Sequence, residues 1–116
     1  MLNFYGYKKC DTCRRAEKYL NEKKIEYKFI DITEKPPAAA QLKKILSASG
    51  HEIKALYNTS GQEYRRLKFK EKAAAMSEAE IFKTLAGNGR LLKRPLVVEG
   101  AKATIGFKDD FKKVWK

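Results

Sequence analysis

Hydrophobic and polar residues follow two different periods along the chain, and the change of period marks the expected elements. Residues 2–7 (LNFYGY) and 25–32 (IEYKFIDI) are apolar or aromatic at roughly every second position, which is typical of short strands. Between them, residues 13–24 carry apolar side chains at helical spacing, with charges on the other face. This order predicts a helix between two parallel strands, joined by a right-handed crossover.

The rest of the chain is predicted to form helices followed by a hairpin and a last helix. Pro36 and Pro37 precede a helix, and Ser77 with Glu80 is typical of a capping box that begins another. Gly100 favours the turn of the hairpin, whose strands are 96–99 and 103–106. The predicted helical segments are 38–49, short pieces within 51–75, 77–86 (ending at 87–89) and 108–115.

Length and composition limit the architecture that these elements can form. The chain has 116 residues, of which 43% are hydrophobic, so it can bury the core of one domain over 1–116. The element order predicts an α/β fold, a mixed sheet flanked by helices, with a helical insertion over about 38–89 between the βαβ half and the hairpin. No apolar run is long enough to span a bilayer, and residues 1–7 lack a signal-peptide layout, so we expect a cytoplasmic protein without a membrane partner.

The charge balance favours anionic partners. Lysine and arginine number 26 against 14 aspartates and glutamates, which gives a formal net charge of +12. The basic residues are spread along the chain, so two interpretations remain open, a solvated surface and a dedicated anion site. Because no dense basic arm is present, we do not expect direct binding to nucleic acid.

Cys10 and Cys13 are the only cysteines, and two residues separate them. This CxxC spacing is the one that thiol-disulfide motifs use, so redox chemistry is the favoured interpretation over inert thiols. A structural zinc site requires four ligands, and His51 is the only soft ligand in the chain besides the two cysteines. We therefore expect neither a metal site nor a cofactor.

The place of Cys10 just before the first helix suggests how its thiolate is stabilised. Free backbone amides and the positive end of the helix dipole favour a negative charge there, although Asp11 opposes it. Basic residues close in sequence add to this effect; they are Lys8, Lys9, Arg14 and Arg15. We predict a lowered pKa and an exposed sulfur for Cys10, and a more buried Cys13 that resolves a mixed disulfide.

Pro95 marks a second candidate element of the site. A proline at this position is either an ordinary strand-start residue or the second residue of a cis peptide bond beside the CxxC motif. In the second case, main-chain groups remain free for an incoming substrate to pair with. Arg94 would then lie near the sulfur, where its permanent charge suits anion recognition.

These motifs in their order resemble the ArsC/Spx family of thioredoxin-fold proteins. The resemblance covers the whole chain and has three parts: Cys10-Asp-Thr-Cys13 between a strand and a helix, the segment 58–67 (NTSGQEYRRL), and Lys93-Arg94-Pro95-Leu96 before a hairpin with residues 105–107 (IGF). It implies a thioredoxin-like fold with a helical insertion. It also implies that Cys10 matches the catalytic cysteine of arsenate reductases.

The chain departs from the arsenate reductase pattern in two respects, and both change the function that we expect. Glutathione-linked arsenate reductases have three oxyanion-site arginines, and only Arg94 has a counterpart here, because Asn58 and Phe107 stand at the other two positions. We therefore do not expect arsenate reduction itself. Cys13 is typical of the Spx-like branch, and the chain is most similar to small arsenate-reductase-like proteins between the two branches.

The resemblance leaves two functions open. The first is a monomeric thiol-disulfide oxidoreductase, in which Cys10 attacks, Cys13 resolves, Arg94 and Pro95 bind the substrate, and glutathione or thioredoxin is the reductant. The second is an Spx-like redox-sensing regulator that binds the carboxy-terminal domain of the RNA polymerase α subunit. The retained Arg94 favours the oxidoreductase.

Overall fold

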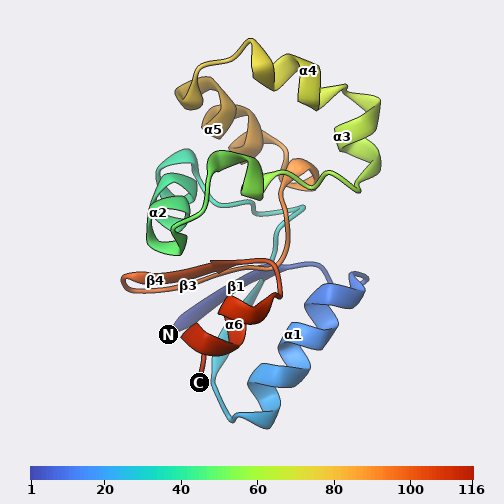
Figure 1. Cartoon of the computed structure of the whole chain (residues 1–116). Coiled ribbons are helices and arrows are strands. Elements are labelled where there is room, and N and C mark those ends of the chain that lie inside the picture. The colour runs from blue at the N-terminus through green and yellow to red at the C-terminus, as the bar shows by residue number, and fades with distance from the viewer.

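The computed structural model describes residues 1–116 and has a four-stranded sheet at its centre (Figure 1). The strands lie in the order β2-β1-β3-β4. Strand β1 (Leu2–Gly6) pairs in parallel with β2 (Tyr27–Asp31) and antiparallel with β3 (Leu96–Glu99), which pairs antiparallel with β4 (Lys102–Ile105). The sheet is mixed, and both the predicted parallel pair and the predicted hairpin are confirmed.

Helices cover both faces of this sheet. Helices α1 (Asp11–Glu22) and α6 (Asp109–Val114) lie below it in Figure 1, and α2 (Ala39–Ser49) lies above. The remaining helices stack beyond α2; they are η1 (Ile53–Leu56), α3 (Gln62–Arg66), α4 (Phe69–Ala74), α5 (Glu78–Gly87) and η2 (Gly89–Leu91). The α/β fold with helices between β2 and β3 is thus confirmed. No helix is long and apolar enough to cross a membrane.

Alternation along the strands divides the buried side chains between two clusters, one on each face of the sheet. In β1, Leu2 and Phe4 pack with α1 and α6, whereas Tyr5 packs toward the opposite cluster. In β3, Val97 joins Leu2 and Phe4, whereas its neighbours face the other way. A period of two therefore buries both faces. The cluster under α1 also contains Cys13, which fixes the position of this sulfur.

Helix α1 begins two residues earlier than predicted. Its first helical residue is Asp11, and Cys10 is the N-cap residue, with φ −90° and ψ 120°. The helix ends at Glu22 rather than Lys24, because Lys24 adopts a left-handed conformation with φ 58°. Cys10 therefore lies just before α1, as predicted, and Cys13 lies in its first turn.

The helix stop predicted at residues 87–89 is confirmed, and Gly89 has a second role. The capping box is confirmed, since Ser77 Oγ accepts from the Glu80 N–H and the Glu80 carboxylate accepts from the Ser77 N–H. The helix then includes Gly87, one residue beyond its predicted end. Gly89 is buried, and a Cβ there would overlap the carbonyl oxygen of Ile32. Close approach of two backbones therefore requires glycine at position 89.

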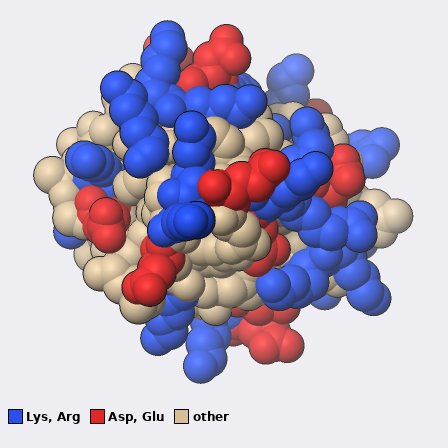
Figure 2. Space-filling model, turned by 90° about the horizontal axis from the view of Figure 1, so that it is seen from below, with Lys and Arg blue, Asp and Glu red and all other residues tan.

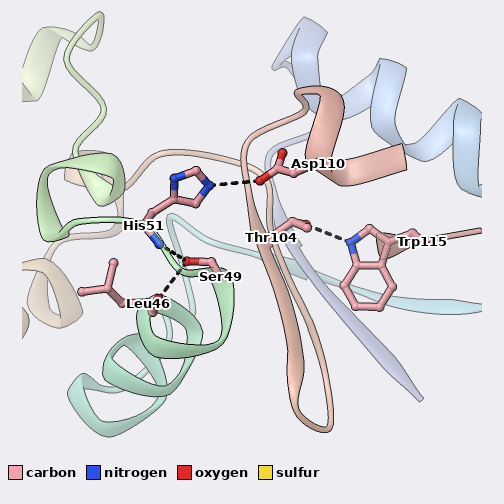
Figure 3. A network of polar contacts seen from close by, with 6 residues as sticks. All are labelled: Leu46, Ser49, His51, Thr104, Asp110 and Trp115. Atoms are coloured by element: carbon pink, nitrogen blue, oxygen red, sulfur yellow. Dashed lines mark hydrogen bonds and ion pairs between the residues drawn. The ribbon is translucent and has the colours of Figure 1, made fainter. Parts of the chain in front are cut away.

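Helix α6 is held at both ends by polar contacts (Figure 3). At its C-terminal side, the buried Trp115 donates from Nε1 to Thr104 Oγ1 of β4 at 2.8 Å. At its N-terminal side, Asp110 Oδ2 lies 3.0 Å from Nε2 of His51, in the segment that follows α2. Figure 3 shows these two side chains pointing toward each other from different elements. The sequence pattern does not predict the His51–Asp110 pair, which joins residues 59 positions apart.

Candidate active site

Cys10 and Cys13 lie where β1 leads into α1. The Cys10 N–H donates to the Tyr7 carbonyl at 3.1 Å, and the Cys10 carbonyl accepts from the Arg14 N–H at 3.0 Å, which begins the helix. Cys10 is half-buried rather than exposed as predicted, because it packs against the cluster beneath α1. Cys13 is fully buried, and the Tyr7 N–H donates to its sulfur at 3.4 Å. One sulfur is therefore partly accessible and the other is enclosed.

The pKa of the Cys10 thiol is lowered even though burial raises it. The opposing contributions come from the backbone N–H and thiol of Cys13 and from the guanidinium of Arg94, all of which favour the thiolate. The Cys10 thiolate is thus stabilised by several neighbouring groups, among which Arg94 provides the full positive charge.

Two of the four basic residues near Cys10 in sequence, Lys8 and Arg15, pair with carboxylates. Lys8 Nζ lies 3.1 Å from the Glu17 carboxylate and 4.0 Å from the centre of the Phe29 ring. Arg15 Nε lies 3.3 Å from the Asp11 carboxylate. None of the four basic neighbours predicted to stabilise the Cys10 thiolate is among the groups that lower its pKa. A residue 84 positions away in the sequence takes their place, because the fold brings Arg94 beside the sulfur.

Cys13 has the opposite electrostatic character. Burial raises the pKa of its thiol to about 12, and the nearby Cys10 adds to the increase, although the Tyr7 N–H opposes it. Near neutral pH, the Cys13 sulfur therefore keeps its proton while the Cys10 sulfur is closer to ionisation. The two cysteines of one motif therefore differ in burial and in acidity.

The peptide bond between Arg94 and Pro95 is cis, which is the second of the two interpretations that the sequence allowed for Pro95. The Arg94 Cζ lies 5.1 Å from the centre of the Tyr7 ring. Neither the N–H nor the carbonyl of Arg94 takes part in a backbone hydrogen bond, whereas the Pro95 carbonyl accepts from the Gly106 N–H at 2.8 Å. The main-chain groups left free at this cis peptide bond are therefore those of Arg94 and not the carbonyl of Pro95.

A pocket extends from Arg94 toward the helices between β2 and β3. We call it the arginine pocket; its volume is about 530 Å³ and its lining residues are Asn58, Ser60, Gly61, Gln62, Glu63, Arg66, Arg90 and Arg94. None of these side chains is hydrophobic. Arg66 and Arg90 were not predicted as site residues, because they lie in separate short helices and no motif spacing links them to Cys10.

The other two positions of the family's arginine set are separated in the structure. Asn58 lines the arginine pocket, and its Nδ2 donates to the Arg90 carbonyl at 3.5 Å. Phe107 packs instead in the cluster beneath α1 that Cys10 also contacts, with its ring centre 5.0 Å from that of Phe111. Of the three arginine positions in the family pattern, only the one at Arg94 therefore holds an arginine. Phe107 instead places an apolar ring near α6, in the cluster that Cys10 contacts.

Charged side chains elsewhere are distributed over the surface. Figure 2 shows lysines and arginines on the face seen from below, with aspartates and glutamates between them. For that face, the mixture of charges fits a solvated surface and not a dedicated anion site. No group of three or more histidine, cysteine, aspartate or glutamate side chains is placed to hold a metal ion.

The sheet order, the helices on both faces and the CxxC motif at the head of α1 define a protein of the thioredoxin-like class. More specifically, the chain belongs to the ArsC family, whose model matches residues 5–113. It is 48% identical to an uncharacterised protein of Bacillus subtilis, YusI, over 98% of both chains.

Solved structures and more distant relatives agree with this family. A crystal structure of an ArsC family related protein from Bacteroides fragilis has a TM-score of 0.92 and 39% identity over 99% of this chain and 97% of its own. A Streptococcus mutans structure described as a possible arsenate reductase has a TM-score of 0.88 and 44% identity over 97% and 96%. The regulatory protein MgsR of Bacillus subtilis is 29% identical over 91% of this chain and 82% of its own.

Proposed function

We propose that the protein is a thiol-disulfide oxidoreductase with Cys10 as nucleophile and Cys13 as resolving cysteine. The observation that carries this proposal is the contrast between the two sulfurs. The pKa of Cys10 is lowered with Arg94 beside it, whereas burial raises the pKa of Cys13 to about 12. A thiolate is the attacking form, so the accessible sulfur is prepared to react first.

The reaction proceeds by two exchanges. The Cys10 thiolate attacks one sulfur of a substrate disulfide, which breaks the S–S bond, forms a mixed disulfide and releases the other half as a thiolate that takes up a proton. Cys13 then loses its proton and attacks the Cys10 sulfur, which releases the second half as a thiol. Two electrons pass from the cysteines to the substrate, and a Cys10–Cys13 disulfide remains. Two glutathione thiols or one reduced thioredoxin return these electrons.

The surroundings of Cys10 support the roles of Arg94 and Pro95 in substrate binding. The Arg94 N–H and carbonyl, free of backbone partners, can pair with the main chain of a peptide substrate, as an added strand does. The guanidinium of Arg94 stabilises the thiolate before attack and the leaving thiolate after it. Pro95 positions Arg94 against Tyr7 and begins β3 at the next residue.

A turnover assay tests the proposal. Reduced protein is mixed with 2-hydroxyethyl disulfide, and glutathione or thioredoxin with its reductase supplies electrons. We expect turnover that depends on Cys10 with at least one of these donors. If the wild-type protein reacts with no disulfide under either donor, the oxidoreductase proposal is wrong.

The second candidate is a redox-sensing regulator. It is favoured by the relatives named regulatory protein MgsR and global transcriptional regulator Spx, the latter 24% identical over 95% of this chain. In this case the Cys10–Cys13 disulfide alters affinity for the RNA polymerase α subunit instead of completing a catalytic cycle. Binding of the purified α subunit to the reduced and oxidised forms, measured beside the turnover assay, separates the two functions.

A further inference from the structure

A second pocket lies within the helical insertion, among η1, α3, α4 and α5, on the far side of α2 from the sheet (Figure 1). We call it the insertion pocket; its volume is about 390 Å³ and its lining residues are Ile53, Lys54, Tyr57, Thr59, Tyr64, Lys70, Ala73, Ala74 and Ile81. It shares no lining residue with the arginine pocket. The thiol exchange proposed for Cys10 therefore uses none of its side chains.

The wall of the insertion pocket is mainly apolar. Ala73 of α4 and Ile81 of α5 supply aliphatic surface. The rings of Tyr57 and Tyr64 pack against the buried ring of Phe69, with centres 5.0 and 6.1 Å from it. Because Phe69 holds both rings in place, this wall is present without a ligand. A preformed apolar wall of this kind favours the burial of a hydrocarbon group.

Tyr57 places one polar group in this apolar wall. The residue is only 7% exposed, and its hydroxyl has no hydrogen-bond partner within the protein. The only fully enclosed side-chain polar atom without a partner is Asp110 Oδ1, so the Tyr57 hydroxyl reaches the space of the pocket that its side chain lines. Burial raises the pKa of this hydroxyl, with further contributions from Tyr64 and Glu78. It is therefore protonated at neutral pH and can donate a hydrogen bond to a ligand.

Two lysines determine the charge of the insertion pocket. Lys54 of η1 and Lys70 of α4 line it from different elements, and both are exposed. Neither forms an ion pair within the protein. No carboxylate lines the pocket, since Glu78, whose charge acts on Tyr57, lies outside the lining. An apolar wall beside two unpaired ammonium groups complements a ligand that is apolar except for one anionic group.

We propose that the insertion pocket binds an amphipathic monocarboxylate, with its hydrocarbon group against Tyr57 and Tyr64 and its carboxylate between Lys54 and Lys70. The Tyr57 hydroxyl donates a hydrogen bond to the same carboxylate. The volume of about 390 Å³ lies within the range of pockets that hold small organic ligands. Binding involves no covalent step and does not depend on the proposed oxidoreductase function.

The test compares ligands that have the same chain length and different head groups. Octanoate, octanamide and octylammonium, each below its micellar concentration, are titrated into the full ¹⁵N-labelled chain, and NMR follows the backbone amide signals. We expect octanoate to shift the signals of residues 53–59 and 69–74 saturably. Octanamide should bind about fivefold more weakly, because it lacks the charge that two exposed lysines contact, and octylammonium more weakly still. Equal affinities for the three probes overturn the inference, and so do shifts confined to other regions.

Two matched variants on α4 separate the contact from net charge. Lys70→Gln and Lys72→Gln each remove one exposed positive charge, but only Lys70 lines the insertion pocket. We expect Lys70→Gln to weaken octanoate binding about threefold and to leave octanamide binding unchanged, whereas Lys72→Gln keeps the wild-type affinities. Equal octanoate affinities in the two variants overturn the inference.

A third variant tests whether the probes occupy the pocket itself. Ala74 lines the insertion pocket and is exposed, so Ala74→Phe adds a ring to the pocket without removing any side chain from the core. We expect it to decrease the affinity for octanoate and octanamide at least tenfold. Undiminished binding in this variant shows that the probes bind elsewhere and overturns the inference. If Ala74→Phe does not fold, the comparison of the two lysine variants still decides the outcome.

Discussion

The head of α1 and the arginine pocket share Arg94, yet they are built in different ways. At the head of α1, both cysteines and the Tyr7 backbone that contacts them lie within seven consecutive residues. The arginine pocket instead gathers residues from α3, from η2 and from the segment before β3. The comparison teaches that the candidate nucleophile is a local feature, whereas its electrostatic partner and its binding surface depend on the complete fold.

The largest expected effect concerns the two cysteines. Cys10→Ser is expected to abolish reaction with disulfides, because the remaining Cys13 thiol is buried and has a pKa raised to about 12. Cys13→Ser is expected to accumulate a mixed disulfide at Cys10, because no second thiol releases it. Mass spectrometry after addition of oxidised glutathione measures both. Adducts at equal levels in the two single variants would contradict the assigned roles.

Gly89→Ala tests how closely the segment that carries Arg90 and Arg94 must approach the rest of the fold. A Cβ at this position overlaps the Ile32 carbonyl oxygen, so we expect a loss of about 2–3 kcal/mol in the free energy of unfolding. Gly87→Ala is the control, since a Cβ there has open space and the effect should stay within about 0.5 kcal/mol. Urea unfolding of both variants measures the difference, and equal stabilities would show that the contact is unimportant.

Arg94→Ala tests the link between the two regions. Because Arg94 lowers the pKa of Cys10, its removal should raise that pKa and decrease the thiolate fraction near neutral pH. Alkylation by iodoacetamide should therefore slow roughly three- to tenfold at neutral pH, with the pH profile displaced to higher pH. Arg94→Lys should recover part of the rate, because it restores the charge. An unchanged profile in Arg94→Ala would assign the lowered pKa to the N–H and thiol of Cys13 alone.

The smallest expected effect concerns the His51–Asp110 pair, which joins α6 to the segment after α2. Both side chains are about one third exposed, so we expect His51→Ala to cost about 0.5–1 kcal/mol of unfolding free energy. Oδ1 of Asp110 is buried without a hydrogen-bond partner, so Asp110→Ala removes an unsatisfied atom together with the pair. A double-mutant cycle gives the coupling energy of the two residues. A coupling of zero would mean that packing alone holds α6.

The sequence predicts the fold well because its signals are local. Alternation in residues 2–7, the capping box at Ser77 and the turn at Gly100 each act over a few residues, and all three features are present in the structure. The sequence places the start of α1 two residues late, because Cys10 serves as the N-cap residue without the oxygen that usually marks one.

The surroundings of the site were harder to predict. Lys8 and Arg15 are near Cys10 in sequence, but Glu17 and Asp11 bind them, and sequence distance does not reveal such pairing. Arg66 and Arg90 lie in helices without a motif, and their approach to Arg94 depends on long-range packing of the chain between β2 and β3. Arg94 could be predicted as a site residue because it belongs to a contiguous motif, residues 93–96, that resembles the ArsC/Spx family.

Titration of the two thiols tests the central claim most directly. The ultraviolet absorbance of the thiolate, followed against pH in Cys13→Ser and in Cys10→Ser, gives the ionisation of each sulfur separately. The account predicts that Cys10 ionises below the ordinary value for cysteine and that Cys13 keeps its proton until strongly alkaline pH, near 12. Two thiols that ionise together near the ordinary value would contradict it.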